Sequence, residues 1–429
     1  ALSYSFTVDQ SAEIEVSSYI DGNIKNEDAN YDEFFWENIK SESNDNQCTL
    51  IARTKKTHFY VGLKTETNLF VDNDKINRFQ SHDSAINSPT VSSFFSIEPD
   101  QSIVIEKKVI IRSSLDVDKD QLDDVLVDEM SNIQNLSYTD LINNQQKAWA
   151  KKWSESDIVI EGDIAAQQAI RFNIFQLNST YSGNDERLNI GPKGFTGEKY
   201  GGSTYWDTEA YCLPFYQSTA DKSIAKNLLI YRYNHLPKAI ENAEKLGFSD
   251  GAALYPMVTM NGEECHNEWE ITFEEIHRNG AIAYAIYDYI NYTADKKYLA
   301  EYGLEVLIGI ARFWKQRVNW SEEKQAYVML GVTGPNEFEN NVNNNWYTNK
   351  MATWCMTYCD ESIDWVKKHF PSDFERICEA SSFDDSERKD WRAISTQMYY
   401  PFSEKHNVYL QQDGFLDKEL IPVSQLSDD

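Results

Sequence analysis

Three separated segments combine carboxylates with aromatic residues, the composition that a carbohydrate site needs. The first covers residues 194–209 and ends in the sequence Tyr-Trp-Asp-Thr-Glu. A carboxylate accepts hydrogen bonds from two sugar hydroxyls, and an aromatic face stacks on the C–H side of the ring. Trp206 and Asp207 are therefore candidate substrate-binding residues. The alternative is an ordinary helix start, with Ser203 or Thr204 as the cap and Asp207 favoured by the helix dipole.

The second segment covers residues 261–280 and places four carboxylates within eight residues, alongside two histidines. His266 and Glu270 are four residues apart, as in some metal sites, but no HExxH-type pattern is present and a metal is disfavoured. The many donors and acceptors, together with one aromatic ring, favour a sugar-binding loop. His266 and Trp269 are the candidate contacts there, and the alternative is a solvated acidic loop.

The third segment, residues 331–349, carries Glu337 directly after a Gly-Pro-Asn sequence. Cleavage of a glycosidic bond needs a carboxylic acid to protonate the leaving oxygen. The pKa of that acid must be raised, which apolar walls and neighbouring carboxylates achieve. Phe338, Glu339 and Trp346 are expected to supply both. The alternative is a loop glutamate without a role.

Residues 1–118 are expected to form β-strands. Residues 12–16, 58–63 and 102–112 alternate between apolar and polar side chains, and polar clusters separate them. This pattern is typical of an antiparallel β-sandwich. The chain opens on alternating residues without an initiator methionine, so we expect the sandwich to be N-terminally incomplete.

A helical period replaces the alternation at residue 119, which predicts a helical linker over residues 119–155. A short strand is expected at residues 158–160. The remainder, residues 156–429, is expected to be almost entirely helical, with long polar and aromatic loops that suggest function. Helix pairs with functional loops at one end suggest an α/α toroid. The expected helices are residues 165–181, 205–217, 224–246, 271–292, 297–314, 346–370 and 386–400.

The composition argues against nucleic-acid-binding and membrane-spanning proteins. The net charge of −29 argues against nucleic acid or an anionic membrane as a partner. No apolar run approaches the ~18 residues that a membrane span needs. The six cysteines are irregularly spaced, and no secretory leader is visible, so we expect reduced thiols and a cytoplasmic location.

The three segments together resemble glycoside hydrolase family 65, the inverting disaccharide phosphorylases. Tyr-Trp-Asp-Thr-Glu at 205–209 and Gly-Pro-Asn-Glu at 334–337 are similar to the family's sugar-binding and catalytic-acid motifs. Residues 264–279 resemble the members that act on maltose and differ from those that act on trehalose or kojibiose. The resemblance extends over most of the chain and is strongest from about residue 163 to 351.

The resemblance implies a multidomain fold: an N-terminal antiparallel β-sandwich, a helical linker and an (α/α)6 barrel catalytic domain. It implies that Glu337 is the general acid, that Trp206 and Asp207 hold the glucosyl unit, and that His266 and Trp269 shape the acceptor subsite. The implied reaction is phosphorolysis of maltose to β-glucose 1-phosphate and glucose. It also implies a homodimer without metal or cofactor, with inorganic phosphate as co-substrate.

One departure from the family concerns its phosphate pocket. In the family a Lys-Gln pair and a Ser-rich phosphate-binding loop follow later in the barrel. No Lys-Gln-Ala-Asp segment is present here, so we expect residues 156–429 to be C-terminally incomplete. The alternatives are a kojibiose, nigerose or trehalose phosphorylase, an inverting α-glucoside hydrolase on the same fold, and a non-catalytic sugar-binding fragment. A hydrolase needs a second carboxylate as base. Asp207 and Glu209 are the visible candidates, and Asp207 is assigned to binding.

Overall fold

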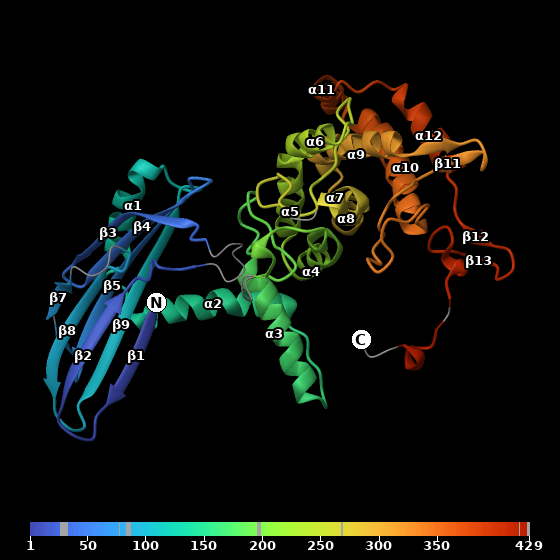
Figure 1. Cartoon of the computed structure of the whole chain (residues 1–429). Coiled ribbons are helices and arrows are strands. Elements are labelled where there is room, and N and C mark those ends of the chain that lie inside the picture. Colours follow the sequence, from blue (N-terminus) through green and yellow to red (C-terminus); the bar gives the residue numbers. More distant parts are fainter. Residues whose placement is uncertain are drawn as a thin grey trace. The chain divides into compact units, whose positions relative to one another are not determined.

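The structure of the chain is a computed structural model that describes residues 1–25, 33–76, 78–82, 87–194, 199–266, 269–419 and 421–426. Contacts divide the chain into two units, Ala1–Ser154 and Glu155–Asp429. The first unit consists mainly of strands and the second mainly of helices (Figure 1).

The strands of the first unit form two antiparallel sheets. One sheet has the order β1-β9-β5-β4-β3, with β6 paired to β5, and the other has the order β2-β8-β7. The alternating segments of the sequence form β2, β5 and β9, as expected. The strands are β1 (Leu2–Thr7), β2 (Ala12–Tyr19), β3 (Trp36–Asn44), β4 (Gln47–Thr54), β5 (Tyr60–Val71), β6 (Asp74–Ile76), β7 (Phe79–His82), β8 (Thr90–Ile97) and β9 (Ser102–Ser113).

The two sheets share a buried apolar core. Val16 and Phe95 come from the smaller sheet, and Leu69 and Ile103 come from the larger one. Inward-facing apolar residues at every second position of a strand give this arrangement, because successive side chains point to opposite faces. The N-terminal unit is therefore an antiparallel sandwich.

Two helices follow the sandwich. The first, α1 (Leu122–Ile133), packs against β5 and β9 through the buried Leu122 and Leu126. The Lys108 ammonium on β9 donates to the carbonyl oxygens of Ile133 (3.2 Å) and Gln134 (2.7 Å) at the end of this helix. A cation at these unpaired carbonyls stabilises the helix C-terminus. The second helix is α2 (Tyr138–Ser156).

The helices of the second unit surround a large apolar core that includes Trp314, Tyr255 and Tyr289. The central helices of this core are α8, α9 and α10, which contact one another. The elements are α3 (Ile164–Thr180), η4 (Thr208–Cys212), α4 (Leu213–Thr219), α5 (Lys222–Asn234), α6 (Leu236–Lys245), α7 (Trp269–Glu274), α8 (Arg278–Thr293), η5 (Leu299–Gly303), α9 (Leu304–Arg317), α10 (Trp346–His369), α11 (Pro371–Ser381) and α12 (Glu387–Gln397), with the hairpins β10 (Asn319–Ser321)–β11 (Ala326–Val328) and β12 (Phe402–Ser403)–β13 (Val408–Tyr409).

Two of the expected long helices are broken. The helix expected at residues 224–246 divides into α5 and α6 at His235, because Pro237 starts a new helix and cannot continue the old one. The helix expected at residues 271–292 divides into α7 and α8. Its break is held by Arg278, whose guanidinium donates to the carbonyl oxygens of Thr272 and Glu275 at the end of α7.

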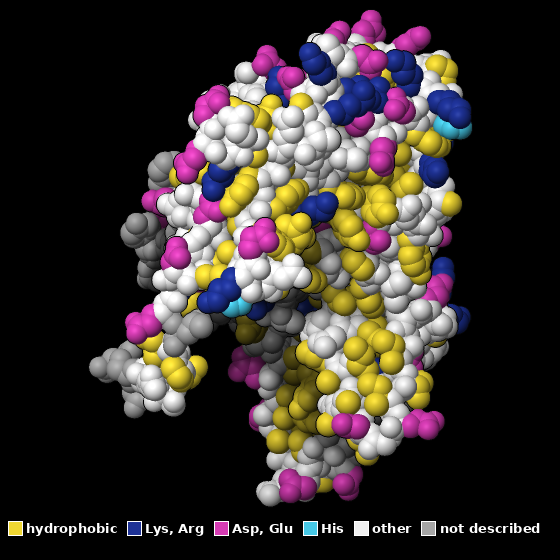
Figure 2. Space-filling view, turned by 90° about the vertical axis from the view of Figure 1, so that its right-hand side faces the viewer, with side chains coloured by type: hydrophobic (Ala, Val, Ile, Leu, Met, Phe, Trp, Pro, Cys, Tyr) yellow, Lys and Arg dark blue, Asp and Glu magenta, His cyan; other side chains and the backbone are white. Residues whose placement is uncertain are grey.

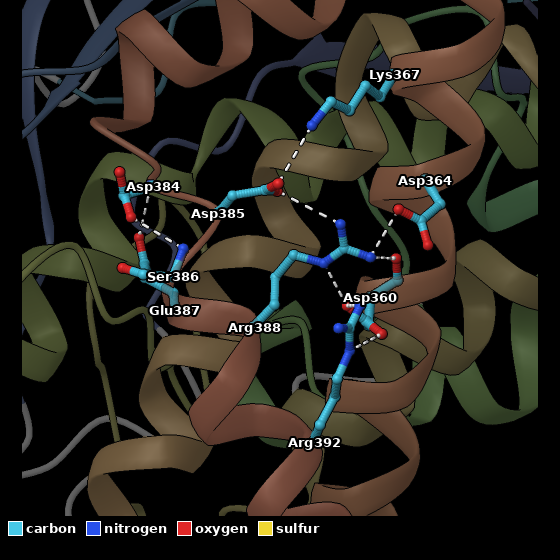
Figure 3. A network of polar contacts seen from close by, with 9 residues as sticks. All are labelled: Asp360, Asp364, Lys367, Asp384, Asp385, Ser386, Glu387, Arg388 and Arg392. Carbon is cyan, nitrogen blue, oxygen red and sulfur yellow. Dashed lines mark hydrogen bonds and ion pairs between the residues drawn. The ribbon is translucent and has the colours of Figure 1, made fainter.

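An ionic cluster fastens α12 to α10 (Figure 3). Arg388 on α12 is almost buried and contacts Asp360 on α10, with Asp364 at 2.7 Å. Arg392 also bonds Asp360, at 2.8 Å. Two guanidinium groups that share one carboxylate form a network, which holds a helix pair more firmly than an isolated surface pair.

One further sequence expectation was wrong in this unit, and some elements were not expected. Residues 158–160 form no strand; instead Gln167 donates to the Ile158 carbonyl (2.8 Å) and accepts from the Ile160 N–H (2.7 Å). The hairpin β10–β11 and the helix α11 were not expected. All six cysteines lie in the described residues, and none of them forms a disulfide.

The surface of the helical unit carries both apolar and charged regions. On the face shown in Figure 2, hydrophobic side chains gather in the middle and charged side chains lie mainly around the edge. Among the described residues, no helix is long and apolar enough to cross a membrane.

Candidate active site

Asp207 in the first segment is half-buried at the start of η4. It occupies the position before the helix, yet its side chain makes no capping hydrogen bond. Burial raises the pKa of the Asp207 carboxyl, while a backbone N–H and the charge of Lys193 act in the opposite direction. A partly desolvated carboxyl that the helix does not use is available to a ligand. The local structure therefore favours a binding role over the helix-start alternative.

A line of aromatic rings connects all three segments. The ring of Trp206, in the first segment, lies 5.0 Å from the ring of His277, in the second, at an angle of 82°. The His277 ring lies 5.8 Å from that of Tyr347, in the third. Burial, and then the charge of Arg278, lowers the pKa of His277 to about 3, so this imidazole is neutral at physiological pH. The structure thus brings together three segments that are far apart in the sequence.

Backbone hydrogen bonds fix the same three segments to one another. Thr204 and Thr259 exchange two bonds, of 2.8 and 3.1 Å, which join the first segment to the chain two residues before the second. The Thr333 N–H donates to the Glu274 carbonyl (3.1 Å), and its hydroxyl donates to the Glu274 carboxylate (2.8 Å). Bonds between main chains do not depend on side-chain rotamers, so the relative positions of the segments are well defined.

The second segment folds around the carboxylate of Glu264. This carboxylate accepts from the N–H groups of Met257 (2.6 Å), Val258 (3.1 Å) and His266 (3.1 Å). His266, a predicted acceptor-site residue, therefore lies in a loop whose backbone is held by the Glu264 carboxylate. Residues 267–268 and the side chain of Trp269, the other predicted acceptor-site residue, lie outside the described part of the structure.

Glu337 in the third segment lines a cavity of about 330 Å³. The second segment contributes Glu270, Ile271 and Glu274 to the same cavity. The exposed Glu337 carboxyl thus reaches a hollow that also borders the predicted acceptor loop. Phe338 is 96% exposed and forms no apolar wall beside Glu337, contrary to expectation. Glycine precedes and asparagines follow this carboxyl, so the loop takes its shape from hydrogen bonds rather than from a packed core.

A later stretch, residues 411–418, holds the loop that carries Glu337; we call this stretch the strap. The Glu339 carboxylate accepts from Gln412 (3.0 Å) and from the Lys418 ammonium. At the end of the loop, Asn344 donates to Asp413 (2.6 Å). Three further bonds join the strap to the loop. The Asn336 amide donates to the Gln411 side-chain oxygen (3.2 Å), and the Trp346 N–H donates to the Gln411 carbonyl (2.8 Å). The Asp413 N–H donates to the Asn343 carbonyl (3.0 Å). The strap therefore restrains the position of Glu337 from outside.

Removal of the strap's cation tests this restraint. Lys418→Met should increase amide hydrogen exchange of residues 333–345 by up to about fivefold, since a partly exposed ion pair contributes at most ~1 kcal/mol. Lys405→Met, which removes an exposed lysine of the same region, is the matched control. Equal exchange in the two variants would show that the backbone bonds alone hold the loop.

Glu209 is used structurally. Its carboxylate forms a two-pronged ion pair with Arg232, with distances of 2.6 and 2.9 Å, and both side chains are at least 97% buried, with exposed fractions of 1% and 3%. Arg232 also donates to the Tyr205 carbonyl (3.2 Å), next to Trp206. A carboxylate whose two oxygens both accept from a guanidinium is a poor base for water. Of the two candidates for a hydrolytic base, Glu209 is therefore engaged by Arg232 and poorly suited to that role.

Sequence reasoning missed Glu275, a fully buried carboxyl that stands two residues before His277 in the sequence. Burial, and then the negative charge of Glu337, raises the pKa of Glu275 to about 8, and Asp207 acts in the same direction. Asp207 and Glu337 thus both lie close enough to affect one buried group. The signal in the sequence was the pair Glu-Glu before Ile-His-Arg, which a continuous amphipathic helix would not bury.

The described residues contain no group of three histidine, cysteine or acidic side chains that could hold a metal ion. The carboxylates and aromatic rings of the three segments have the chemistry to bind a neutral polyhydroxyl compound.

Comparison with known proteins yields matches along most of the chain. Residues 1–152 match the N-terminal domain of glycosyl hydrolase family 65, and residues 171–429 match the central catalytic domain of the same family. A maltose phosphorylase of Bacillus subtilis is 46% identical over 417 residues, which are 97% of this chain and 53% of that protein. An α,α-trehalose phosphorylase of Thermoanaerobacter brockii is 31% identical, over 98% of this chain and 55% of that protein.

A solved structure agrees with these matches. A chain named as a kojibiose phosphorylase from human microbiome superposes with a TM-score of 0.87 and 28% identity, over 99% of this chain and 55% of that one. The chain spans about half the length of the curated relatives it matches.

Proposed function

Because the chain belongs to glycosyl hydrolase family 65, we propose that its protein is an inverting disaccharide phosphorylase acting on maltose. Maltose and inorganic phosphate would give β-glucose 1-phosphate and glucose. The substrate is proposed on the 46% identity to the Bacillus subtilis maltose phosphorylase, which exceeds the 31% to the trehalose phosphorylase. We include in the proposal an (α/α)6 barrel as the architecture of the complete catalytic domain, a homodimer and a cytoplasmic location.

The observation that carries the proposal is the cavity shared by Glu337 and the second segment. Glu337 is the proposed general acid, which protonates the glycosidic oxygen as the bond to C1 breaks. Phosphate attacks C1 from the opposite face, and this single displacement converts the α-anomer to the β-anomer. Hydrogen phosphate carries a proton, so the carboxyl can be protonated again without a second catalytic base.

Trp206 and Asp207 are proposed to hold the glucosyl unit in the donor subsite. The half-buried Asp207 carboxyl supports this role, because it makes no capping hydrogen bond. The loop from residue 263 to 271, including His266 and Trp269, is proposed to shape the acceptor subsite and so to select the linkage. Its position at the cavity of Glu337 supports this role.

Product analysis tests the proposed reaction. Maltose is incubated with and without phosphate, and the products are followed by proton NMR, for the 429-residue chain and for the full-length gene product. We expect β-glucose 1-phosphate from the full-length protein only when phosphate is present. Equal release of glucose without phosphate would instead identify a hydrolase. Turnover of kojibiose, nigerose or trehalose in place of maltose would reassign the acceptor subsite.

Substitution of Asp207 tests the donor subsite. Asp207→Asn keeps the shape of the side chain but removes the charge that strengthens hydrogen bonds to sugar hydroxyls. We expect weaker glucose binding, by roughly 1.5–3 kcal/mol or about 10- to 150-fold, and slower turnover. Calorimetric titration with glucose measures the binding. Unchanged affinity and rate would return Asp207 to a purely local role at the start of η4.

A further inference from the structure

The loop that is proposed to shape the acceptor subsite begins in a closed turn, residues 258–265, which we call the neck. The Cys265 N–H donates to the Val258 carbonyl (2.9 Å), and this bond closes the turn. His266, the first of the proposed acceptor contacts, follows the neck directly in the sequence. The position of the neck therefore determines where this side chain starts.

Tyr231 on α5 bonds the main chain of the neck. Its hydroxyl donates to the Met260 carbonyl (3.0 Å). Tyr231 is 2% exposed, whereas Met260 is 58% exposed, so a buried group holds an otherwise exposed piece of chain. Such a bond fixes direction as well as distance, because it weakens steeply away from its preferred geometry. On α6, Lys238 lies 3.4 Å from the Glu263 carboxylate, but this pair is exposed and contributes little.

His235, at the break between α5 and α6, also contacts the neck. Its ring lies 4.2 Å from the Tyr231 ring, at an angle of 76°. Gly262 in the neck has a φ of +95°, a conformation that favours glycine, and a Cβ there would lie 3.0 Å from two atoms of the His235 ring. Burial, and then the charge of Arg232, lowers the pKa of His235 to about 4, so this contact is made by a neutral ring.

The three residues that contact the neck are regularly spaced along the chain. Tyr231, His235 and Lys238 are four and three residues apart, which is the spacing of side chains on one side of a helix. All three contact the neck although a new helix begins at Leu236 between them. The end of α5 and the start of α6 therefore form one support for the neck.

We propose that Tyr231 and His235 are positioning residues of the acceptor subsite, which act through the neck and do not touch the substrate. This inference rests on the proposed function for the role of the acceptor loop. Two main-chain bonds join Thr259 in the neck to Thr204 in the first segment, and they remain when the Tyr231 hydroxyl is lost. Loss of that hydroxyl should therefore displace the acceptor loop and spare the donor subsite.

The first experiment measures amide hydrogen exchange in the full-length gene product and needs no enzymatic activity. Tyr231→Phe keeps the ring and removes the bond to Met260. We expect exchange of residues 258–265 to become roughly 3- to 10-fold faster, as for the loss of one hydrogen bond. Tyr233→Phe is the matched control, because it removes a hydroxyl from the same helix on a ring that packs against Tyr302. Equal exchange of the neck in the two variants would overturn the role of Tyr231.

The second experiment runs the proposed reaction in reverse, from β-glucose 1-phosphate and glucose to maltose and phosphate. The KM for glucose reports on the acceptor subsite, and the KM for β-glucose 1-phosphate reports on the donor subsite. Tyr231→Phe should raise the KM for glucose roughly 3- to 10-fold and leave the KM for β-glucose 1-phosphate within about twofold. An unchanged KM for glucose, or equal changes in both values, would overturn the positioning role.

His235 is tested by the same two KM values. His235→Ala removes the ring that the neck contacts and should also raise the KM for glucose selectively. His235→Phe restores an uncharged ring and should recover most of that loss; no recovery would exclude a packing role for His235. If the unmodified protein makes no maltose, the proposed function is wrong, while the exchange experiment still decides whether Tyr231 holds the neck.

Discussion

Glu337→Gln should reduce maltose phosphorolysis by roughly 10²–10⁴-fold, the usual contribution of a general acid. The amide has nearly the shape of the carboxyl but cannot give a proton to the glycosidic oxygen. Glu337 is exposed on its loop, so the substitution should leave both the fold and sugar binding almost unchanged. Rates are measured by release of β-glucose 1-phosphate, and binding is measured by calorimetric titration with maltose.

Two controls separate the loss of a proton donor from a disturbed loop. Glu339→Gln changes the carboxylate two residues away, which is bound by the strap, and should have a much smaller effect. α-Glucosyl fluoride has a leaving group that needs little protonation, so the Glu337→Gln variant should retain far more activity on it than on maltose. A variant that turns over maltose well, or loses both substrates equally, would show that Glu337 is not the acid.

Arg232→Met should destabilise the helical unit by roughly 3–5 kcal/mol, the cost of leaving one member of a buried ion pair without its partner. Arg232 and Glu209 are almost completely buried and are joined by two hydrogen bonds. The loss also frees the Tyr205 carbonyl, so the donor segment should be disturbed as well. Urea unfolding followed by tryptophan fluorescence measures the transition.

Two further variants test whether the loss at Arg232 comes from an unpaired buried charge. Arg187→Met removes an ion pair with Asp185 of similar length, 2.6 Å, but at a partly exposed position, and should cost at most about 1 kcal/mol. Replacement of both partners, Glu209→Leu with Arg232→Met, should recover most of the stability, because no buried charge remains unpaired. Equal losses at Arg232 and Arg187 would show that water reaches the buried pair.

The sequence was most informative where a local pattern is repeated. Alternation located β2, β5 and β9, and the apolar spacing of Leu122, Leu126 and Met130 located α1. The pairing of tryptophan with carboxylates identified the three segments that the structure brings together around His277. These signals are readable because one face of each element must be apolar, whatever lies beyond it.

The sequence was least informative where contacts between distant residues determine the local conformation or the burial of a side chain. The break between α7 and α8 depends on Arg278 reaching back to carbonyl oxygens, and no apolar spacing records such bonds. Phe338 was expected to cover Glu337, but the loop is held by the strap some 75 residues later, so its aromatic ring points away. Glu275 was hidden for the same reason: its burial follows from the packing of other segments.

The attachment of the second segment has a consequence for how such proteins diversify. Main-chain bonds from Thr259 to Thr204 and from Glu274 to Thr333 fix the two ends of the stretch between them. Inside the stretch, the Glu264 carboxylate accepts from the His266 N–H. The bonds at both ends involve the main chain, so the side chains between them can change without loss of these bonds. The residues of this stretch could be exchanged between relatives, by evolution or by loop grafting, while Asp207 and Glu337 keep their places.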